Sequence, residues 1–199
     1  MKYMLLIVVF SGFVVQSNAQ KSVNFIASYP ISFPMGNLSD YVGETSFRGI
    51  SFEVNLVQNE KVEYGLETSW HVFYQEESSK VYTDGNVSIK GAQFRYINAV
   101  PLLAQARWTF RDEKEQKKFA PFVGGGIGTL YVNQATDFGL YRITKEAWQF
   151  CLRPELGILF KNSNSVPGGF LSVRYYAGFN TDELDAQSYL SLNIGIRFN

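Results

Sequence analysis

Cysteine and histidine are nearly absent from this 199-residue chain. Cys151 is the single cysteine and His71 the single histidine. A lone cysteine cannot form a disulfide within the chain, and one cysteine with one histidine is too little for a Cys/His-rich zinc site. We therefore expect neither a disulfide framework nor a metal site, and no motif indicates a cofactor.

A surplus of charge of one sign is also lacking. Lysine and arginine together number 18, as do aspartate and glutamate, so no basic excess indicates nucleic-acid binding. Proline is scarce, with 6 residues, whereas aromatic residues make up 16% of the chain and glycine numbers 17. The abundance of aromatic residues favours strands, and the length fits a single domain.

The first 19 residues have the features of a secretory signal peptide. Lys2 supplies a positive charge, an apolar stretch follows over residues 4–15, and small residues occupy 17–19; this is the order found in cleaved signals. The stretch is too short for a membrane anchor. We therefore expect cleavage after Ala19, a signal peptide at 1–19 and one mature domain at 20–199. Residue 20, directly after this cleavage site, is glutamine rather than cysteine, which argues against a lipid-anchored form.

Long apolar runs are missing after the signal. A transmembrane helix needs about 18 or more consecutive apolar residues, so a membrane location would require a closed β-barrel. The mature chain instead alternates apolar and polar residues with period two, which indicates strands. In residues 188–198, one face is apolar from Leu190 to Phe198, whereas the other holds Asn193 and Arg197.

The same alternation predicts eight strands, at 23–33, 50–56, 62–74, 102–110, 123–131, 148–160, 171–179 and 188–198. Their lengths approach the roughly 9–11 residues of a tilted membrane strand. Short turns are expected at 58–61, 111–118 and 161–168, and longer links at 34–46, 75–91, 133–145 and 180–187. This alternation is typical of a transmembrane barrel. We predict an all-β, eight-stranded antiparallel up-and-down barrel, with a bulge or strand end near Pro30, Pro101 and Pro154.

Alternation alone leaves open which face is outside. A soluble lipocalin-like, lipid-binding barrel would hide its apolar face, whereas a membrane barrel exposes it. Here aromatic residues collect toward both ends of the apolar face, as two lipid–water interfaces require, and the first segment lacks the Gly-x-Trp motif of lipocalins. We therefore favour the membrane barrel, with aromatic girdles formed by Phe25, Tyr64, Trp70, Tyr74, Trp108, Phe110, Trp148, Phe160 and Phe198.

The polar face carries both charge signs near the middle of the strands. Inside a narrow barrel such charges must pair to be tolerated, and an eight-stranded barrel is just wide enough for side chains to fill. We predict a charge network in the lumen and no open pore for large solutes. Its members are Glu53, Glu63, Glu67, Arg107, Arg153, Glu155, Arg174 and Arg197.

The mature chain resembles the small outer-membrane β-barrels of Gram-negative bacteria, the porin-like family of OmpX-type and OmpA-transmembrane-type domains. The final segment YLSLNIGIRFN carries the resemblance most specifically, with APFVGGGIGTLYV and RPELGILF. The resemblance implies integration among outer-membrane lipids and a signal for the barrel-assembly machinery at Tyr189, Leu192, Ile194, Ile196 and Phe198. Asn199 departs from the pattern, which ends on the aromatic residue. The family implies no single activity.

The sequence offers one candidate for catalysis. Glu67, Ser69 and His71 share a strand face, which could suggest a lipid-modifying barrel enzyme, but neighbours on one face lie about 7 Å apart, farther than a catalytic hydrogen bond. We therefore expect no enzyme, and a structural or surface-interaction role through the loops. The acidic residues of the loops, among them Asp40, Asp182, Glu183 and Asp185, could bind cations but fit a solvated surface better.

Overall fold

The computed structural model describes residues 22–59, 61–84, 87–110, 119–138, 141–160 and 168–198, without the side chains of 78–91. The predicted signal peptide and the turn at 111–118 lie outside these residues, as does most of the turn at 161–168. One short helix, α2 (Asn37–Tyr41), follows the first strand. The strands are β1 (Val23–Met35), β2 (Gly49–Val57), β3 (Val62–Asp84), β4 (Val87–Thr109), β5 (Phe119–Phe138), β6 (Tyr141–Phe160), β7 (Gly168–Gly178) and β8 (Ser188–Phe198).

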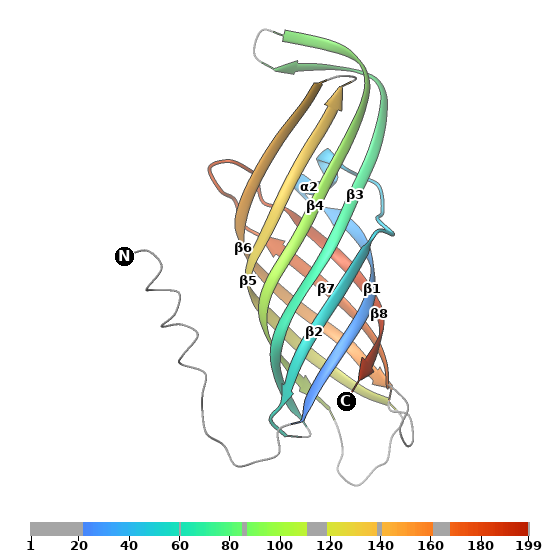
Figure 1. Ribbon diagram of the computed structural model, residues 1–199, viewed down its shortest axis with the longest axis vertical. Coiled ribbons are helices and arrows are strands. Elements are labelled where there is room, and N and C mark those ends of the chain that lie inside the picture. The colour runs from blue at the N-terminus through green and yellow to red at the C-terminus, as the bar shows by residue number, and fades with distance from the viewer. Residues whose placement is uncertain are drawn as a thin grey trace, which may run out of the picture.

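The eight strands form one closed barrel in the order of the sequence (Figure 1). Each strand pairs antiparallel with the next, and β1 closes the ring against β8, where Phe25 lies opposite Phe198. This confirms the predicted eight-stranded up-and-down barrel. Closure leaves the paired parts of the strands without an open edge, which is the only way a sheet can satisfy its backbone groups in lipid.

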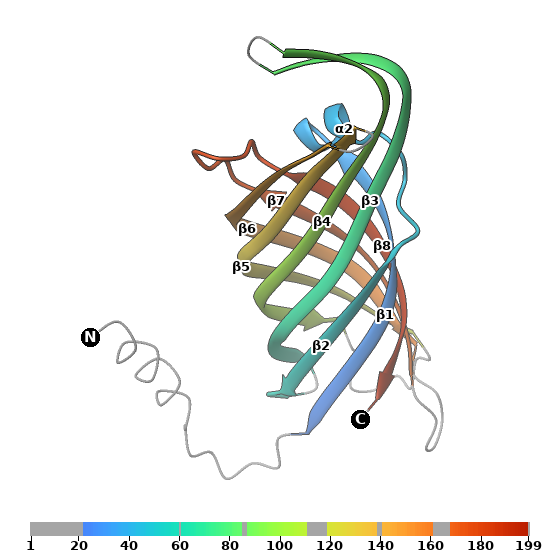
Figure 2. The same ribbon diagram turned by 45° about the horizontal axis from the view of Figure 1, so that its top comes forward.

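The barrel is much taller on one side than the other. β3 and β4 have 23 residues each and β5 and β6 have 20 each, whereas β7 and β8 have 11. The longer strands therefore continue beyond the ring as a curved sheet (Figure 2). The prediction of links at 75–91 and 133–145 is wrong, because strand pairing continues through Glu77 and up to Phe138. Of the four longer links that were predicted, the one at 180–187 and the one at 34–46, which contains α2, do separate strands.

The three prolines lie inside strands without shifting their register. Pro30 faces Asn193 of β8 and sits where pairing between β1 and β2 stops at Ser28. Pro101 and Pro154 each lie where one ladder is interrupted and then resumes in the same register. The prediction of a bulge or strand end is therefore confirmed only at Pro30, where the ladder with β2 ends. At Pro101 and Pro154 neither occurs: the missing N–H removes a ladder hydrogen bond, but the partner strand on the other side holds the chain in register.

The apolar face of the sheet is on the outside. Leu66 is 66% exposed and Leu156 is 64% exposed, although both lie in the middle of the barrel wall. Exposed and buried positions alternate along the barrel wall, as in Phe52, Glu53 and Val54 of β2. The soluble lipocalin-like alternative requires the opposite arrangement and is wrong. Within the described residues, no helix has the length and apolar character needed to cross a bilayer.

Candidate functional site

The lumen is filled from end to end by side chains in layers. At the end of the short Gln58–Lys61 turn lies a lower apolar cluster, formed by Ile26, Ala120, Phe122, Leu159 and Phe170. At the other end lies an upper apolar cluster, which includes Leu38 of α2, Phe73, Ile97, Tyr176 and Tyr189. Between the two clusters the inner face is polar and charged. The buried charged residues therefore lie between two apolar clusters.

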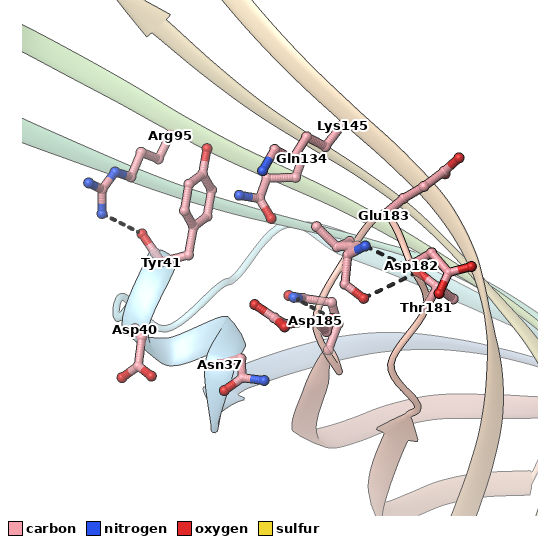
Figure 3. Close-up of a pocket in the computed structure, with 12 residues that line it drawn as sticks. Asn37, Asp40, Tyr41, Arg95, Gln134, Lys145, Thr181, Asp182, Glu183 and Asp185 are labelled. Atoms are coloured by element: carbon pink, nitrogen blue, oxygen red, sulfur yellow. Dashed lines mark hydrogen bonds between the residues drawn. The ribbon is translucent and has the colours of Figure 1, made fainter. Parts of the chain in front are cut away.

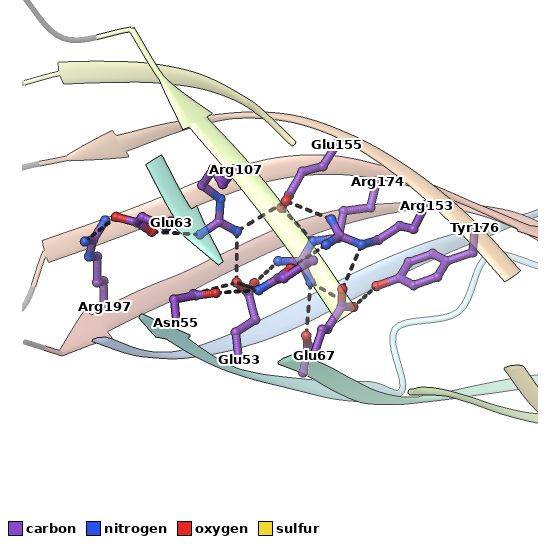
Figure 4. A network of polar contacts seen from close by, with 12 residues as sticks. Glu53, Asn55, Glu63, Glu67, Arg107, Arg153, Glu155, Arg174, Tyr176 and Arg197 are labelled. Carbon is purple, nitrogen blue, oxygen red and sulfur yellow. Dashed lines mark hydrogen bonds and ion pairs between the residues drawn. The ribbon is translucent and has the colours of Figure 1, made fainter. Parts of the chain in front are cut away.

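The eight charged residues predicted for the lumen lie in one connected network (Figure 4). It holds as many carboxylates as guanidinium groups, so its formal charges cancel. Arg174 is at its centre. Its Nε donates to Glu155 Oε1 at 2.8 Å, its Nη1 lies 3.3 Å from Glu67 Oε1, and its Nη2 donates to Glu53. Arg174 is completely buried, so these carboxylates supply the stabilisation that water gives to an exposed guanidinium group.

Two further arginines complete the central pairing. Arg107 Nη2 lies 2.8 Å from Glu53 Oε2 and 3.2 Å from Glu155 Oε2. Arg153 lies on the other side, with Nε 2.7 Å from Glu67 Oε2 and Nη1 2.7 Å from Glu155 Oε2. Glu155 thus contacts three guanidinium groups. Such charge-assisted pairs are stronger than neutral hydrogen bonds, and their mutual sharing ties strands β2, β3, β4, β6 and β7 together across the lumen.

The network extends to the lower end through Glu63. Its Oε1 accepts from Arg197 Nη2 at 2.6 Å, and its Oε2 lies 3.6 Å from Arg107 Nη1. The Arg107 guanidinium also lies 4.5 Å from the centre of the Phe122 ring. A cation over a ring face is attracted by the negative face of the aromatic system. The charged layer and the lower apolar cluster are therefore in direct contact.

The predicted network leaves out several polar members, including Gln105 and Tyr176. Gln105 Nε2 donates to Glu53 Oε2 at 2.9 Å and to Asn55 Oδ1 at 2.8 Å, while its Oε1 accepts from Arg153. The Tyr176 hydroxyl donates to Glu67 Oε1. Period two could have found both, because Gln105 and Tyr176 lie two residues from Arg107 and Arg174 on the same inner face.

Ser69 and His71 are closer than the sequence suggested. Ser69 Oγ is 2.9 Å from His71 Nε2, so the expectation that they stand too far apart is wrong; the side chains lean toward each other although their backbones do not. The other ring nitrogen, Nδ1, is 2.8 Å from Ser32 Oγ, and Glu67 instead contacts Arg153, Arg174 and Tyr176. Among the described residues no carboxylate completes a triad.

The predicted girdle residues all lie on the outer face of the barrel. Trp70, Trp108 and Trp148 are each more than half exposed. Several aromatic rings contact rings on the neighbouring strand, as Phe119 does with Phe160 at the short-turn end and Tyr131 with Trp148 toward the other. The outer surface therefore has aromatic residues at two levels with aliphatic residues between them.

The residues predicted as the assembly signal divide between the two faces. Ile194, Ile196 and Phe198 are exposed on the outside of β8, and Leu192 is half-buried on the same face. Tyr189 lies inside, completely buried and stacked on Tyr176 with ring centres 4.6 Å apart. Only four of these five residues thus face the surroundings of the barrel.

A polar cavity lies at the taller end of the barrel (Figure 3). It has a volume of about 430 Å³ and lies above the upper apolar cluster, between α2, the strands β4 to β6 and the link between β7 and β8. Its walls include the acidic side chains Asp40, Asp182, Glu183 and Asp185. Sequence reasoning placed these residues in loops but had no means of bringing α2 next to the link at 180–187.

Comparison with known proteins gives a fold but no close relative. No protein-family model matches the sequence, and no curated protein sequence matches it. Among solved structures, neisserial surface protein A is 12% identical, with a TM-score of 0.59 over 90% of this chain and 98% of that one. The N-terminal barrel of Pseudomonas aeruginosa OprF (10%, TM-score 0.47, 90% and 100%) and Escherichia coli outer membrane protein W (17%, 0.42, 92% and 100%) also match. By its fold and its apolar exterior, the chain is a small eight-stranded β-barrel of the outer-membrane type.

Proposed function

We propose that this protein is an integral outer-membrane barrel with a structural or surface-interaction role, a closed lumen and no catalytic site. The observation that carries the proposal is the balanced charge network enclosed between two apolar clusters. An apolar exterior embeds such a barrel in lipid, and a filled interior leaves its taller end as the part that can meet other molecules.

The packing of the lumen supports a barrel that does not conduct. Arg153 and Arg174 are among the largest fully buried side chains, and both are held by carboxylates of other strands. Opening a pore here would require several buried ion pairs to separate. Since leaving a buried charge without its partner is strongly unfavourable, the network favours a closed state.

The unequal strand lengths support a surface role. A membrane strand needs about 9–11 residues, which β7 and β8 match with 11 each, whereas β3 and β4 continue for 23. Barrels of this type have short turns on the periplasmic side and longer segments outside the cell. The taller end would therefore face the exterior, together with α2 and the polar cavity.

We also propose that β8 is the strand read by the assembly machinery. Its outer face presents Ile194, Ile196 and Phe198 to the surroundings. Tyr189 serves instead as part of the interior, because it is buried against Tyr176. Replacing Phe198 with serine should lower the amount of folded barrel in the membrane, whereas a Tyr189→Phe variant should assemble normally. Equal assembly of the two variants would contradict this assignment.

The proposed orientation is tested by labelling intact cells with a membrane-impermeant maleimide. In a Cys151→Ala background, one variant carries Glu183→Cys in the link between β7 and β8, and the other carries Gln58→Cys in the short turn. We expect labelling of residue 183 on intact cells and of residue 58 only after lysis. The reverse result would place the taller end in the periplasm.

The closed lumen and the absence of catalysis are tested on the purified barrel. In planar bilayers it should show no steady conductance, and a stable open channel would disprove the closed lumen. The alternative function, lipid modification through Ser69 and His71, is favoured by their 2.9 Å contact. Both residues are buried, however, with His71 completely so. We expect no ester hydrolysis above a detergent blank; hydrolysis that disappears in Ser69→Ala would establish the enzyme instead.

A further inference from the structure

The cavity at the taller end combines an excess of negative charge with fixed walls. Asp40 comes from α2, whereas Asp182, Glu183 and Asp185 come from the link between β7 and β8. Among the described residues, no ion pair involves any of these four carboxylates. Two basic residues also line the cavity, but Arg95 is already engaged by Glu77 at 3.3 Å. The cavity therefore favours positively charged molecules.

A buried acceptor in the same cavity lacks a donor. Gln187 lines the cavity and is only 2% exposed. Its Nε2 donates to the backbone oxygen of Asp185 at 3.0 Å, which fixes the orientation of the amide. In the part of the chain that the structure describes, its Oε1 has no hydrogen-bond partner. A buried acceptor without a partner is unfavourable, so a molecule that brings an N–H to this atom is stabilised there.

The walls are held in place before anything binds. Gln149 Nε2 donates to the backbone oxygen of Asp185 at 2.7 Å, and Thr181 is hydrogen-bonded to Leu184 through both its backbone and its hydroxyl group. Leu184 itself is anchored in the upper apolar cluster. On the opposite side, the Tyr41 hydroxyl donates to the backbone oxygen of Ala135 at 3.0 Å. A site arranged in advance loses less free energy on ordering its groups.

The spacing of the carboxylates distinguishes between kinds of cation. A metal ion needs several ligands that converge on one point, and no group of three or more His, Cys, Asp or Glu residues within the described chain does so. The carboxylates instead lie on two sides of the cavity, Asp40 on α2 and the other three on the link between β7 and β8 (Figure 3). An organic cation with several spaced amino groups matches this arrangement, because each ammonium group carries three donors.

We propose that this cavity binds a linear polyamine. One ammonium group donates to Gln187 Oε1 and the others lie beside the carboxylates of α2 and of the link between β7 and β8. A volume of about 430 Å³ lies within the range of small-molecule sites, roughly 300–1,000 Å³. The inference deepens the proposed surface role by naming a ligand class, but it does not depend on the orientation of the barrel.

The test is calorimetric titration of spermidine into the purified mature protein in a zwitterionic detergent. We expect saturable binding at one site, weakened with rising salt. The Asp182→Asn/Asp185→Asn double variant should bind at least tenfold more weakly and with a smaller salt dependence. Gln187→Leu should bind several-fold more weakly with the salt dependence unchanged, because it removes a neutral acceptor. Folding of each variant is checked by its gel mobility with and without boiling.

Two variants outside this set make the result decisive. Lys145 lines the cavity, and no ion pair of the described residues involves it, so Lys145→Gln should tighten binding. Asp137 lies outside the cavity, paired with Arg142, so Asp137→Asn should leave binding unchanged. The proposal is overturned if spermidine binds no better than Mg²⁺ at equal charge concentration, if the amino acid lysine binds more tightly than spermidine, or if Asp137→Asn weakens binding as much as the cavity variants. Failure here would leave the labelling test of orientation untouched.

Discussion

Glu155 and Arg174 face each other across β6 and β7, and Arg174 Nε donates to Glu155 Oε1 at 2.8 Å. The ladder between β6 and β7 is interrupted at Pro154 and resumes with this pair. The same glutamate also contacts Arg107 and Arg153. The ion pairs that fill the lumen therefore depend on the strand register, and a register slip would separate several buried charges from their partners.

Removal of Arg174 should destabilise the barrel strongly. An Arg174→Met variant keeps most of the side-chain volume but leaves Glu53, Glu67 and Glu155 short of one partner. Breaking a buried pair in this way typically costs about 3–5 kcal/mol. We expect this loss in the free energy of unfolding, measured by urea titration in detergent and followed by tryptophan fluorescence.

The matched control for Arg174 is Arg142, which pairs with Asp137 at 3.1 Å but is 61% exposed. Exposed pairs contribute about 0–1 kcal/mol, so Arg142→Gln should unfold almost as the unmodified protein does. Similar losses for the two variants would show that the lumen is hydrated and screens its charges.

Close approach of neighbouring strands should make Gly128 irreplaceable. A Cβ atom at this position would clash with the backbone oxygen of Leu102 and lie 3.0 Å from Leu103 Cα. Backbone atoms of a closed barrel cannot move aside, and overpacking costs about 1–3 kcal/mol or more. Gly128→Ala should therefore lower the urea midpoint or block folding. Gly125→Ala on the same strand should be tolerated, since its Cβ would meet only the Arg153 oxygen, at 3.9 Å.

Period two was sufficient to predict the strands and which residues share a face, and the aromatic residues at both ends of the apolar face indicated that this face is outside. Each inward position was assigned from its place in an alternating segment, as with Arg107 and Arg197, and this needs no knowledge of the neighbours. The pairing partners were beyond reach, because they depend on the stagger between strands. That Glu53 meets an arginine 121 residues away follows from the register around the whole ring, which no local pattern encodes.

Strand ends were predicted less well, for a physical reason. Residues 75–91 and 133–145 are rich in polar side chains, and segments without apolar alternation are typical of loops. Outside the membrane, however, both faces of a sheet can be wetted, so strands continue there without apolar alternation. Lys145 and Gln134 illustrate this, since both are polar yet lie opposite each other in the β5–β6 ladder. The cavity was missed because it depends on this extension and on α2.

A charge on the outer face should reveal how far the lipid extends along β6. Leu156 is 64% exposed in the wall of the barrel, and Tyr141 is 71% exposed near the far end of the same strand. An arginine facing lipid at the bilayer midplane costs about 2–4 kcal/mol, falling to 0–1 near the interface. Leu156→Arg should therefore destabilise the barrel folded in lipid vesicles by about 2–4 kcal/mol.

Tyr141→Arg is the matched control for the same strand. Its position lies beyond Trp148, in the part of β6 that we place outside the membrane, so the substitution should change the folding free energy by less than about 1 kcal/mol. A loss below about 1 kcal/mol for Leu156→Arg would mean that this position does not face the lipid core, and a large loss at Tyr141 would place the membrane boundary farther along β6.

The single cysteine offers a probe of lumen access without any engineering. Cys151 is completely buried within the upper apolar cluster and packs with the residues that separate the charge network from the cavity. A small maleimide should therefore react with it only when the barrel opens, so labelling should be negligible in the folded protein and complete in urea. Because labelling in the folded state measures opening, its rate should rise in Arg174→Met and stay low in Arg142→Gln. Rapid labelling of the unmodified, folded protein would contradict a closed lumen, since the reagent could reach Cys151 only by passing one of the two apolar clusters.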